Sequence, residues 1–183
     1  MNKIVKCALA AVMTLCFALP VAAKVEAAKV AVVPLIMDEK VEDEKGMKPI
    51  LYSDAIAKTF QFPEYELVAD TDLVRQVALA QQDKLFTREG MQAVLDATKA
   101  DIVVAMSVDK FEWTENRMYR EPKTQCDFRG KFATLNGLTG KYVFDNWSDD
   151  AERETESISA KEDWPHAEFG RFVRRELKKA VRK

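Results

Sequence analysis

Cysteine is scarce in this chain of 183 residues, and histidine is scarcer. Two of the three cysteines, Cys7 and Cys16, lie in the first twenty residues, so Cys126 is the one thiol of the remainder. An intramolecular disulfide is excluded there, and the hydrophobic core must hold the fold. Because His166 is the single histidine, a metal site of several histidines is excluded, and a Ser-His-Asp triad would need this one ring.

The chain also lacks an excess of positive charge. The 28 Lys and Arg residues stand against 30 Asp and Glu residues, for a formal net charge of -2. This value becomes -4 when Lys3 and Lys6 are removed with a leader peptide. A general nucleic-acid-binding domain carries a basic excess, so we expect no nucleic-acid partner.

The apolar stretch at the start is too short to span a bilayer. Cys7 to Leu19 is an uncharged run of 13 residues, against the roughly 20 that a transmembrane helix needs. Lys3 and Lys6 precede this run, Pro20 ends it, and small residues follow, which is the layout of a signal peptide. We predict that residues 1–23 are a cleavable signal peptide and that 24–183 form a single α/β globular domain.

The cleavage position has two candidates, after Ala23 or after Ala27, because both fit the same small-residue pattern. Lipoprotein processing needs a cysteine that follows a small residue, whereas Cys16 follows Leu15 and Cys7 follows Lys6. We therefore expect no lipid anchor, and a periplasmic or extracellular location.

The first half of the mature chain predicts alternating strands and helices. Residues 29–36 are rich in β-branched side chains and predict a buried strand, followed by a solvated loop over the charged tract 38–45. A helix should begin at Pro49 and end before Pro63, with a short strand at 65–69. Asp70 or Thr71 should cap a second helix and Thr87 a third, before a strand at 101–106.

The second half changes to long alternating segments, which predict antiparallel strands. We expect a turn at 114–116, then a strand with Cys126, Phe128 and Phe132 on a buried face and Asp127 and Arg129 on a wet face. Residues 136–140 should form a hairpin turn, with Gly140 at positive φ, before a strand at 141–147. An acidic stretch at 149–156, a loop around 164–165 and a closing amphipathic helix at 166–182 complete the chain.

The predicted fold class is α/β, a mixed sheet with flanking helices and a long antiparallel hairpin in the C-terminal half. The strand Lys-Val-Ala-Val-Val-Pro at 29–34, the Ala-Asp-Ile-Val-Val strand at 100–104 and the hairpin at 134–145 follow in this order. In this arrangement the chain resembles a broad group of bacterial envelope proteins. The group includes the periplasmic domain of the curli secretion channel, the N-terminal domain of the Tol-system propeller protein and the lipoprotein activators of penicillin-binding proteins.

The hairpin of that group often reads as an aspartate, a Thr-Gly pair and an aromatic-containing strand. Here Asn136 takes the place of the aspartate, while Thr139 and Gly140 match. The resemblance implies a fold and a place in envelope assembly or secretion more than a defined activity. Charges such as Lys110 and Glu112 interrupt the strands, so we expect no lipid-facing barrel and no pore.

The closing helix carries the strongest charge asymmetry of the chain. From Arg171 onward its cations are opposed by Glu176 alone, and they are candidates for contact with a partner or an anionic membrane surface: Arg171, Arg174, Arg175, Lys178, Lys179 and Arg182. Its apolar positions Phe169, Phe172, Val173 and Leu177 favour docking of the helix on the sheet. The outer face would then remain for attraction to an acidic partner.

Three other features have structural explanations that we favour. Cys126 in an alternating strand suits a small core side chain better than a nucleophile. The acidic residues from Asp145 to Glu154 suit a solvated strand edge better than a calcium loop, because they lack the loop's glycine and terminal glutamate. Gly137 and Gly140 suit a hairpin turn, because no Gly-Lys-Ser/Thr follows.

The leading functional hypothesis is an exported, non-enzymatic cell-envelope module that binds a protein partner or an envelope component without a cofactor. The alternative is an exported metal-dependent or hydrolytic enzyme that uses His166 and the acidic residues downstream of Phe144. A homo-oligomer, including a ring, stays open.

Overall fold

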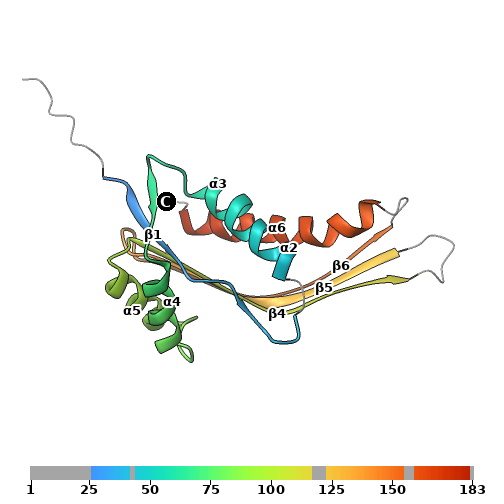
Figure 1. The fold of residues 1–183 in the computed structure, drawn as a ribbon, viewed down its shortest axis with the longest axis horizontal. Coiled ribbons are helices and arrows are strands. Elements are labelled where there is room, and N and C mark those ends of the chain that lie inside the picture. Colours follow the sequence, from blue (N-terminus) through green and yellow to red (C-terminus); the bar gives the residue numbers. More distant parts are fainter. Residues whose placement is uncertain (1–25, 42–43, 117–122, 155–158, 182–183) are drawn as a thin grey trace, which may run out of the picture.

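The computed structural model describes residues 26–41, 44–116, 123–154 and 159–181 (Figure 1). The predicted signal peptide lies outside these ranges, so its cleavage stays a prediction. None of the helices in these ranges combines the length and the apolar character that a membrane crossing requires.

A six-stranded mixed sheet forms the centre of the molecule, which confirms the predicted fold class. The strand order is β3-β1-β4-β5-β6, and β2 pairs with β4 beside this path. The pairs of β1 with β3, β1 with β4 and β2 with β4 are parallel, whereas β4, β5 and β6 are antiparallel. The strands are β1 Ala28–Val32, β2 Ile36–Met37, β3 Tyr65–Leu67, β4 Ile102–Asn116, β5 Lys123–Asn136 and β6 Lys141–Glu154.

The predicted single strand at 29–36 is divided in the structure. β1 ends at Val32, and β2 begins only at Ile36. Pro34 lies between them, and a proline has no N–H with which to continue a ladder. The backbone of Val33 still donates to the carbonyl of Val104 at 2.9 Å, so the chain stays against β4 through the break.

One face of the sheet carries two helical segments (Figure 1). The first consists of α2 Glu44–Pro49, the π-helix η1 Ile50–Ile56 and α3 Ala57–Thr59. It begins inside the charged tract that we predicted to be a loop. Met47 is completely buried in the core, and this contact explains why the tract is helical.

The second segment on this face is α6 Ser159–Val181. The predicted loop around Trp164 and Pro165 is wrong, because both residues lie inside this helix. A proline removes one helical hydrogen bond, but good helix formers such as Ala160 and Ala167 lie on either side of it. α6 packs on the sheet through the predicted apolar positions Phe169, Phe172, Val173 and Leu177.

The other face is covered only near one end, by α4 Thr71–Ala80 and α5 Arg88–Thr98 (Figure 1). Both predicted caps are confirmed. The carboxylate of Asp70 accepts from the amide of Leu73 at 2.9 Å, and the hydroxyl of Thr87 accepts from the amide of Gly90 at 3.2 Å. These helices bury a second hydrophobic cluster that includes Val94.

The long strands differ from the sequence prediction at their far ends. The predicted turn at 114–116 is wrong, because β4 continues in register to Asn116, which pairs with Lys123. β6 likewise runs beyond the predicted end at 147, through much of the acidic stretch, to Glu154. Cross-strand pairing overrides the weak strand preference of these polar residues.

The hairpin turn between β5 and β6 is confirmed. The side chain of Asn136 accepts from the amides of Leu138 and Thr139 at 3.0 and 3.2 Å, and Gly140 has a φ of 68°. The predicted wet face of β5 needs a correction at this end. Arg129 is exposed, but Ala133 on the same face is buried, because α4 and α5 cover it.

Candidate functional site

The cations of α6 point away from the sheet because its apolar residues point toward it. Phe169 and Leu177 are completely buried, whereas the side chain of Arg175 is 62% exposed. We name the outward set the basic face of α6: Arg171, Arg174, Arg175, Lys178 and Lys179, which together line a depression of about 390 Å³. Arg182, predicted as part of this set, lies outside the described residues.

Several cations of the basic face already contact carboxylates of the same chain. Arg174 forms an ion pair with Asp54 of η1, and Arg171 forms one with Glu168. Lys179 lies 3.5 Å from a carboxylate oxygen of Asp145 on β6. Among the residues that the structure describes, Lys178 has no carboxylate partner, so the face keeps one uncompensated charge.

The ion pair to η1 also changes the acidity of its carboxylate. Asp54 accepts a hydrogen bond from Lys58, and this contact lowers the pKa of Asp54 below its ordinary value. Partial burial acts in the opposite direction, and the charge of Arg174 lowers the pKa further. Asp54 therefore stays ionised and ties α6 to its neighbouring helix.

Glu176 differs from its predicted place among the surface charges of this helix. Its side chain is completely buried on the sheet side of α6. Arg175 donates to one carboxylate oxygen at 3.1 Å. The ammonium of Lys179 lies 2.6 Å from the other, in an ion-pair contact whose angles do not make a hydrogen bond. Its spacing from Phe172 and Ala180 on the helix is the signal that places it on the buried face.

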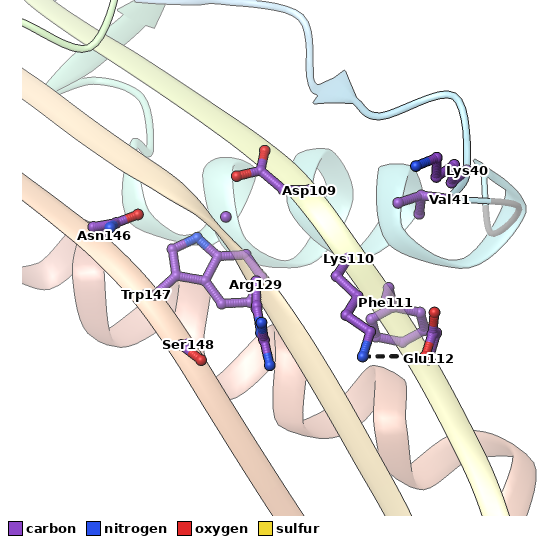
Figure 2. A pocket seen from close by; sticks show the side chains of 11 residues that line it. Lys40, Val41, Asp109, Lys110, Phe111, Glu112, Arg129, Asn146, Trp147 and Ser148 are labelled. Carbon is purple, nitrogen blue, oxygen red and sulfur yellow. Dashed lines mark ion pairs between the residues drawn. The ribbon is translucent and has the colours of Figure 1, made fainter.

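The sequence did not predict a groove whose charged and polar side chains lie on the face of the sheet opposite α6. Figure 2 views this groove, with α6 and the α2 segment behind the strands. It has a volume of about 580 Å³ and is lined by residues of three strands and the loop after β2: Lys40, Val41, Asp109, Lys110, Phe111, Glu112, Arg129, Gly130, Asn146, Trp147 and Ser148. The alternating charges of β4 and β5 were its only signal in the sequence.

A β-bulge creates the groove. The register of β4 against β5 shifts between Val108 and Lys110, so Asp109 is an extra residue with no partner in β5. Within the described residues, the pairing of β2 with β4 ends at the same Val108, and the chain then turns away at Lys40. The face of the sheet is therefore open from the bulge outward.

The groove contains an ion-pair network on its sheet floor. Lys110 donates to Asp127 and lies 3.2 Å from a carboxylate oxygen of Glu112. The hydrogen bond to Asp127 is the main cause that raises the pKa of Lys110, followed by the one to Glu112. Arg129 is 55% exposed, and its Nε lies 3.5 Å from Asp127. Both signs of charge are thus fixed side by side.

The other candidate residues lie in the core or in α6. Cys126 is completely buried in the hydrophobic cluster that packs against α6. His166 lies in α6, with its ring 5.4 Å from the ring of Phe111 between centroids. Within the described parts of the chain, no three His, Cys, Asp or Glu residues group as metal ligands. The side chains of the acidic residues 149–154 lie outside what the structure describes.

Comparisons with known proteins give only distant structural likenesses. The chain matches no family model and no curated protein. Three solved structures with some likeness are the lipoprotein GNA1162 from Neisseria meningitidis, a PelC dodecamer from Paraburkholderia phytofirmans and the C-terminal domain of LpoB from Salmonella enterica.

The likeness to each of these structures is weak. Their identities to this chain are 12%, 14% and 16%, in the same order, and their TM-scores are 0.40, 0.40 and 0.34. The matches cover 80%, 81% and 73% of this chain, and 98%, 86% and 87% of the other chains. With TM-scores below 0.5, they assign neither a family nor a function to this protein.

Proposed function

We propose that this chain is an exported, non-enzymatic module of the bacterial cell envelope that binds an acidic protein partner through the basic face of α6. The observation that carries the proposal is the division of α6 into two faces. Its apolar residues dock on the sheet, and the exposed side chains of its cations lie on the outward face, where a partner can meet them. Charge complementarity then selects an acidic partner.

The ion pairs within the basic face do not prevent this role. Arg171, Arg175 and Lys179 have side chains that are 61%, 62% and 46% exposed. The pair of Arg171 with Glu168 has an exposed cation and contributes about 0 to 1 kcal/mol, so an incoming carboxylate exchanges with it at little cost. Arg175 and Lys179 also contact the buried carboxylate of Glu176, and their exposed parts can meet a partner while these contacts remain. Lys178, without a carboxylate partner in the described residues, adds a further cation to the face.

An acidic protein is favoured over a membrane surface by the state of the apolar residues. A helix that lies in a membrane interface inserts its apolar face among the lipids. Here Phe169, Phe172 and Leu177 face the sheet and are buried. Only electrostatic attraction would remain for a bilayer, whereas a protein can place carboxylates opposite individual cations.

Site-specific photo-crosslinking in the source bacterium tests this proposal. A photoreactive residue at position 178 of the full chain should give one defined adduct with an acidic envelope protein. Arg171→Glu should reduce the adduct about tenfold, because reversing this contact costs on the order of 1.4 kcal/mol. Arg75→Glu is the matched control, since Arg75 is exposed on α4 at the opposite face.

Two outcomes would contradict the proposal. One is the absence of an adduct from position 178 while the protein is present at its normal level. The other is flotation of the purified protein with phosphatidylglycerol vesicles, lost in Arg171→Glu and kept in Arg75→Glu, which would assign the face to a membrane.

Export is tested separately by mass spectrometry of the protein produced with its own first 23 residues and recovered from the periplasm. We expect an unmodified chain that begins at Lys24 or, with the alternative cleavage, at Ala28. A protein that keeps Met1, or one that carries a lipid, would contradict this part of the proposal.

A further inference from the structure

We propose that the groove at the β-bulge is a second binding site and that it takes a short zwitterionic peptide, one with both carboxylate and ammonium groups. The groove and the basic face of α6 lie on opposite faces of the sheet. This site is therefore independent of the partner proposed for α6.

The size and the walls of the groove are those of a ligand site. Its volume of about 580 Å³ lies within the roughly 300 to 1,000 Å³ of small-ligand pockets. Gly130 forms part of its floor, where a Cβ atom would lie 2.0 Å from the carbonyl oxygen of Ser107. The backbone is packed closely under the groove at this point.

The charges that face the groove select a ligand of both signs. The one ion pair of Arg129 among the described residues uses its Nε, at 3.5 Å from Asp127, which leaves the terminal N–H groups for an incoming carboxylate. Asp109 accepts from the hydroxyl of Ser107 through Oδ1 at 3.1 Å and keeps its second oxygen for an ammonium group. Both side chains are on exposed positions of the open sheet.

The uncharged lining groups suit the peptide bonds of such a ligand. Asn146 and Ser148 are exposed on β6 and offer an amide and a hydroxyl. The ring of Trp147 is no part of this surface, because it packs against Phe172 of α6 on the other face of the sheet.

Other ligand classes fit these walls less well. A polyphosphate or a nucleic acid would meet the carboxylates of Asp109 and Glu112. A saccharide usually stacks on an open aromatic ring, but the ring of Trp147 packs against Phe128 and Phe172, at centroid distances of 5.1 and 4.6 Å. An apolar ligand would bury the charges of the groove without partners.

Titration of the 15N-labelled mature protein with the free tetrapeptide Ala-Glu-Lys-Ala tests the site. We expect saturable shifts of the amides around Asp109 and Arg129. We expect about tenfold weaker binding for each of the variants Arg129→Gln and Asp109→Asn. Each variant loses one charge-assisted contact, and a loss of roughly 1.4 kcal/mol is a tenfold change in the dissociation constant. Arg75→Gln on α4 should bind like the unchanged protein.

Two further probes make the ligand class falsifiable. Blocked Ala-Gln-Gln-Ala, acetylated and amidated at its ends, should give no saturable shift, and a neutral chitin trisaccharide should give none. Equal binding of the blocked peptide, binding of the trisaccharide alone, or no saturable shift with any probe would overturn the proposal. Unchanged melting temperatures of the two groove variants would show that lost binding is not lost folding.

Discussion

Gly140 shows how a single residue decides a turn. Its φ of 68° lies in the left-handed region, and the nearest atom to a Cβ added at this position would be Arg88 Nη2 at 4.0 Å. There is space for a side chain, so any penalty comes from the backbone alone. We predict that Gly140→Val lowers the free energy of unfolding by about 1 to 3 kcal/mol, measured by urea denaturation.

Gly140→Asn is the matched control, because asparagine tolerates the left-handed region better than a β-branched residue does. It should cost clearly less than the valine variant. Equal stability of the valine variant and the unchanged protein would contradict the assigned turn.

At Gly130 the constraint is steric and not conformational. Its backbone is extended, but neighbouring atoms already occupy the space that a side chain would need. A Cβ atom would lie 2.0 Å from the carbonyl oxygen of Ser107 and 2.7 Å from the ring of Trp147. We predict that Gly130→Ala destabilises the protein by about 1 to 3 kcal/mol, the usual cost of overpacking. A melting temperature at or above that of the unchanged protein would show that the strand relaxes without loss.

At the scale of elements, the link between η1 and α6 depends on pH through Asp54. Its pKa is held below the ordinary value of 3.8 by Lys58 and Arg174. A carboxylate with a lowered pKa stabilises the fold above the pKa of the unfolded state, and this contribution is lost as the pH falls through the folded-state pKa. Asp54→Asn should therefore reduce stability at pH 7, and the difference should shrink below about pH 4.

Urea denaturation at pH 7 and at pH 3 checks this prediction. Asp72→Asn is the control, because Asp72 and Arg75 form an exposed pair, with side chains 77% and 59% exposed, and such a pair contributes little. A loss in Asp54→Asn that is the same at both pH values would show that the contact acts by packing and not by charge.

The elements also show which parts of the fold the sequence could predict. Asp70, Thr87 and Asn136 act within their own turn, through hydrogen bonds to amides two or three residues away. Such local signals predicted the caps and the hairpin turn correctly. The predicted end of β4 was wrong, because polar strand residues such as Thr114 are held by their partner Gln125 across the sheet.

The two candidate sites also differ in whether the sequence could predict them. The basic face of α6 was predictable, because helical spacing alone separates its cations from Phe172 and Leu177. The groove was not, because it requires the bulge at Asp109, the end of β2 and the side chain of Asn146 on a third strand. Contacts between distant segments make it, and no local pattern encodes them.

At the scale of the whole molecule, two hydrophobic clusters lie on opposite faces of one sheet. The cluster under α6 contains Val104, and the cluster under α4 and α5 contains Val103, its direct neighbour on β4. The two faces therefore share their strands, and neither cluster survives loss of the sheet. This arrangement supports the prediction that residues 24–183 are a single domain.

A single domain should unfold in one cooperative transition. We predict that Leu177→Ala in the first cluster and Met91→Ala in the second each lower the free energy of unfolding by about 2 to 5 kcal/mol. Each variant should shift the circular dichroism transition and the tryptophan fluorescence transition together, because in a two-state protein both signals report the same unfolding equilibrium. If Met91→Ala moved only part of the circular dichroism transition and left the fluorescence transition in place, α4 and α5 would be a separate unit, and the chain would not be one domain.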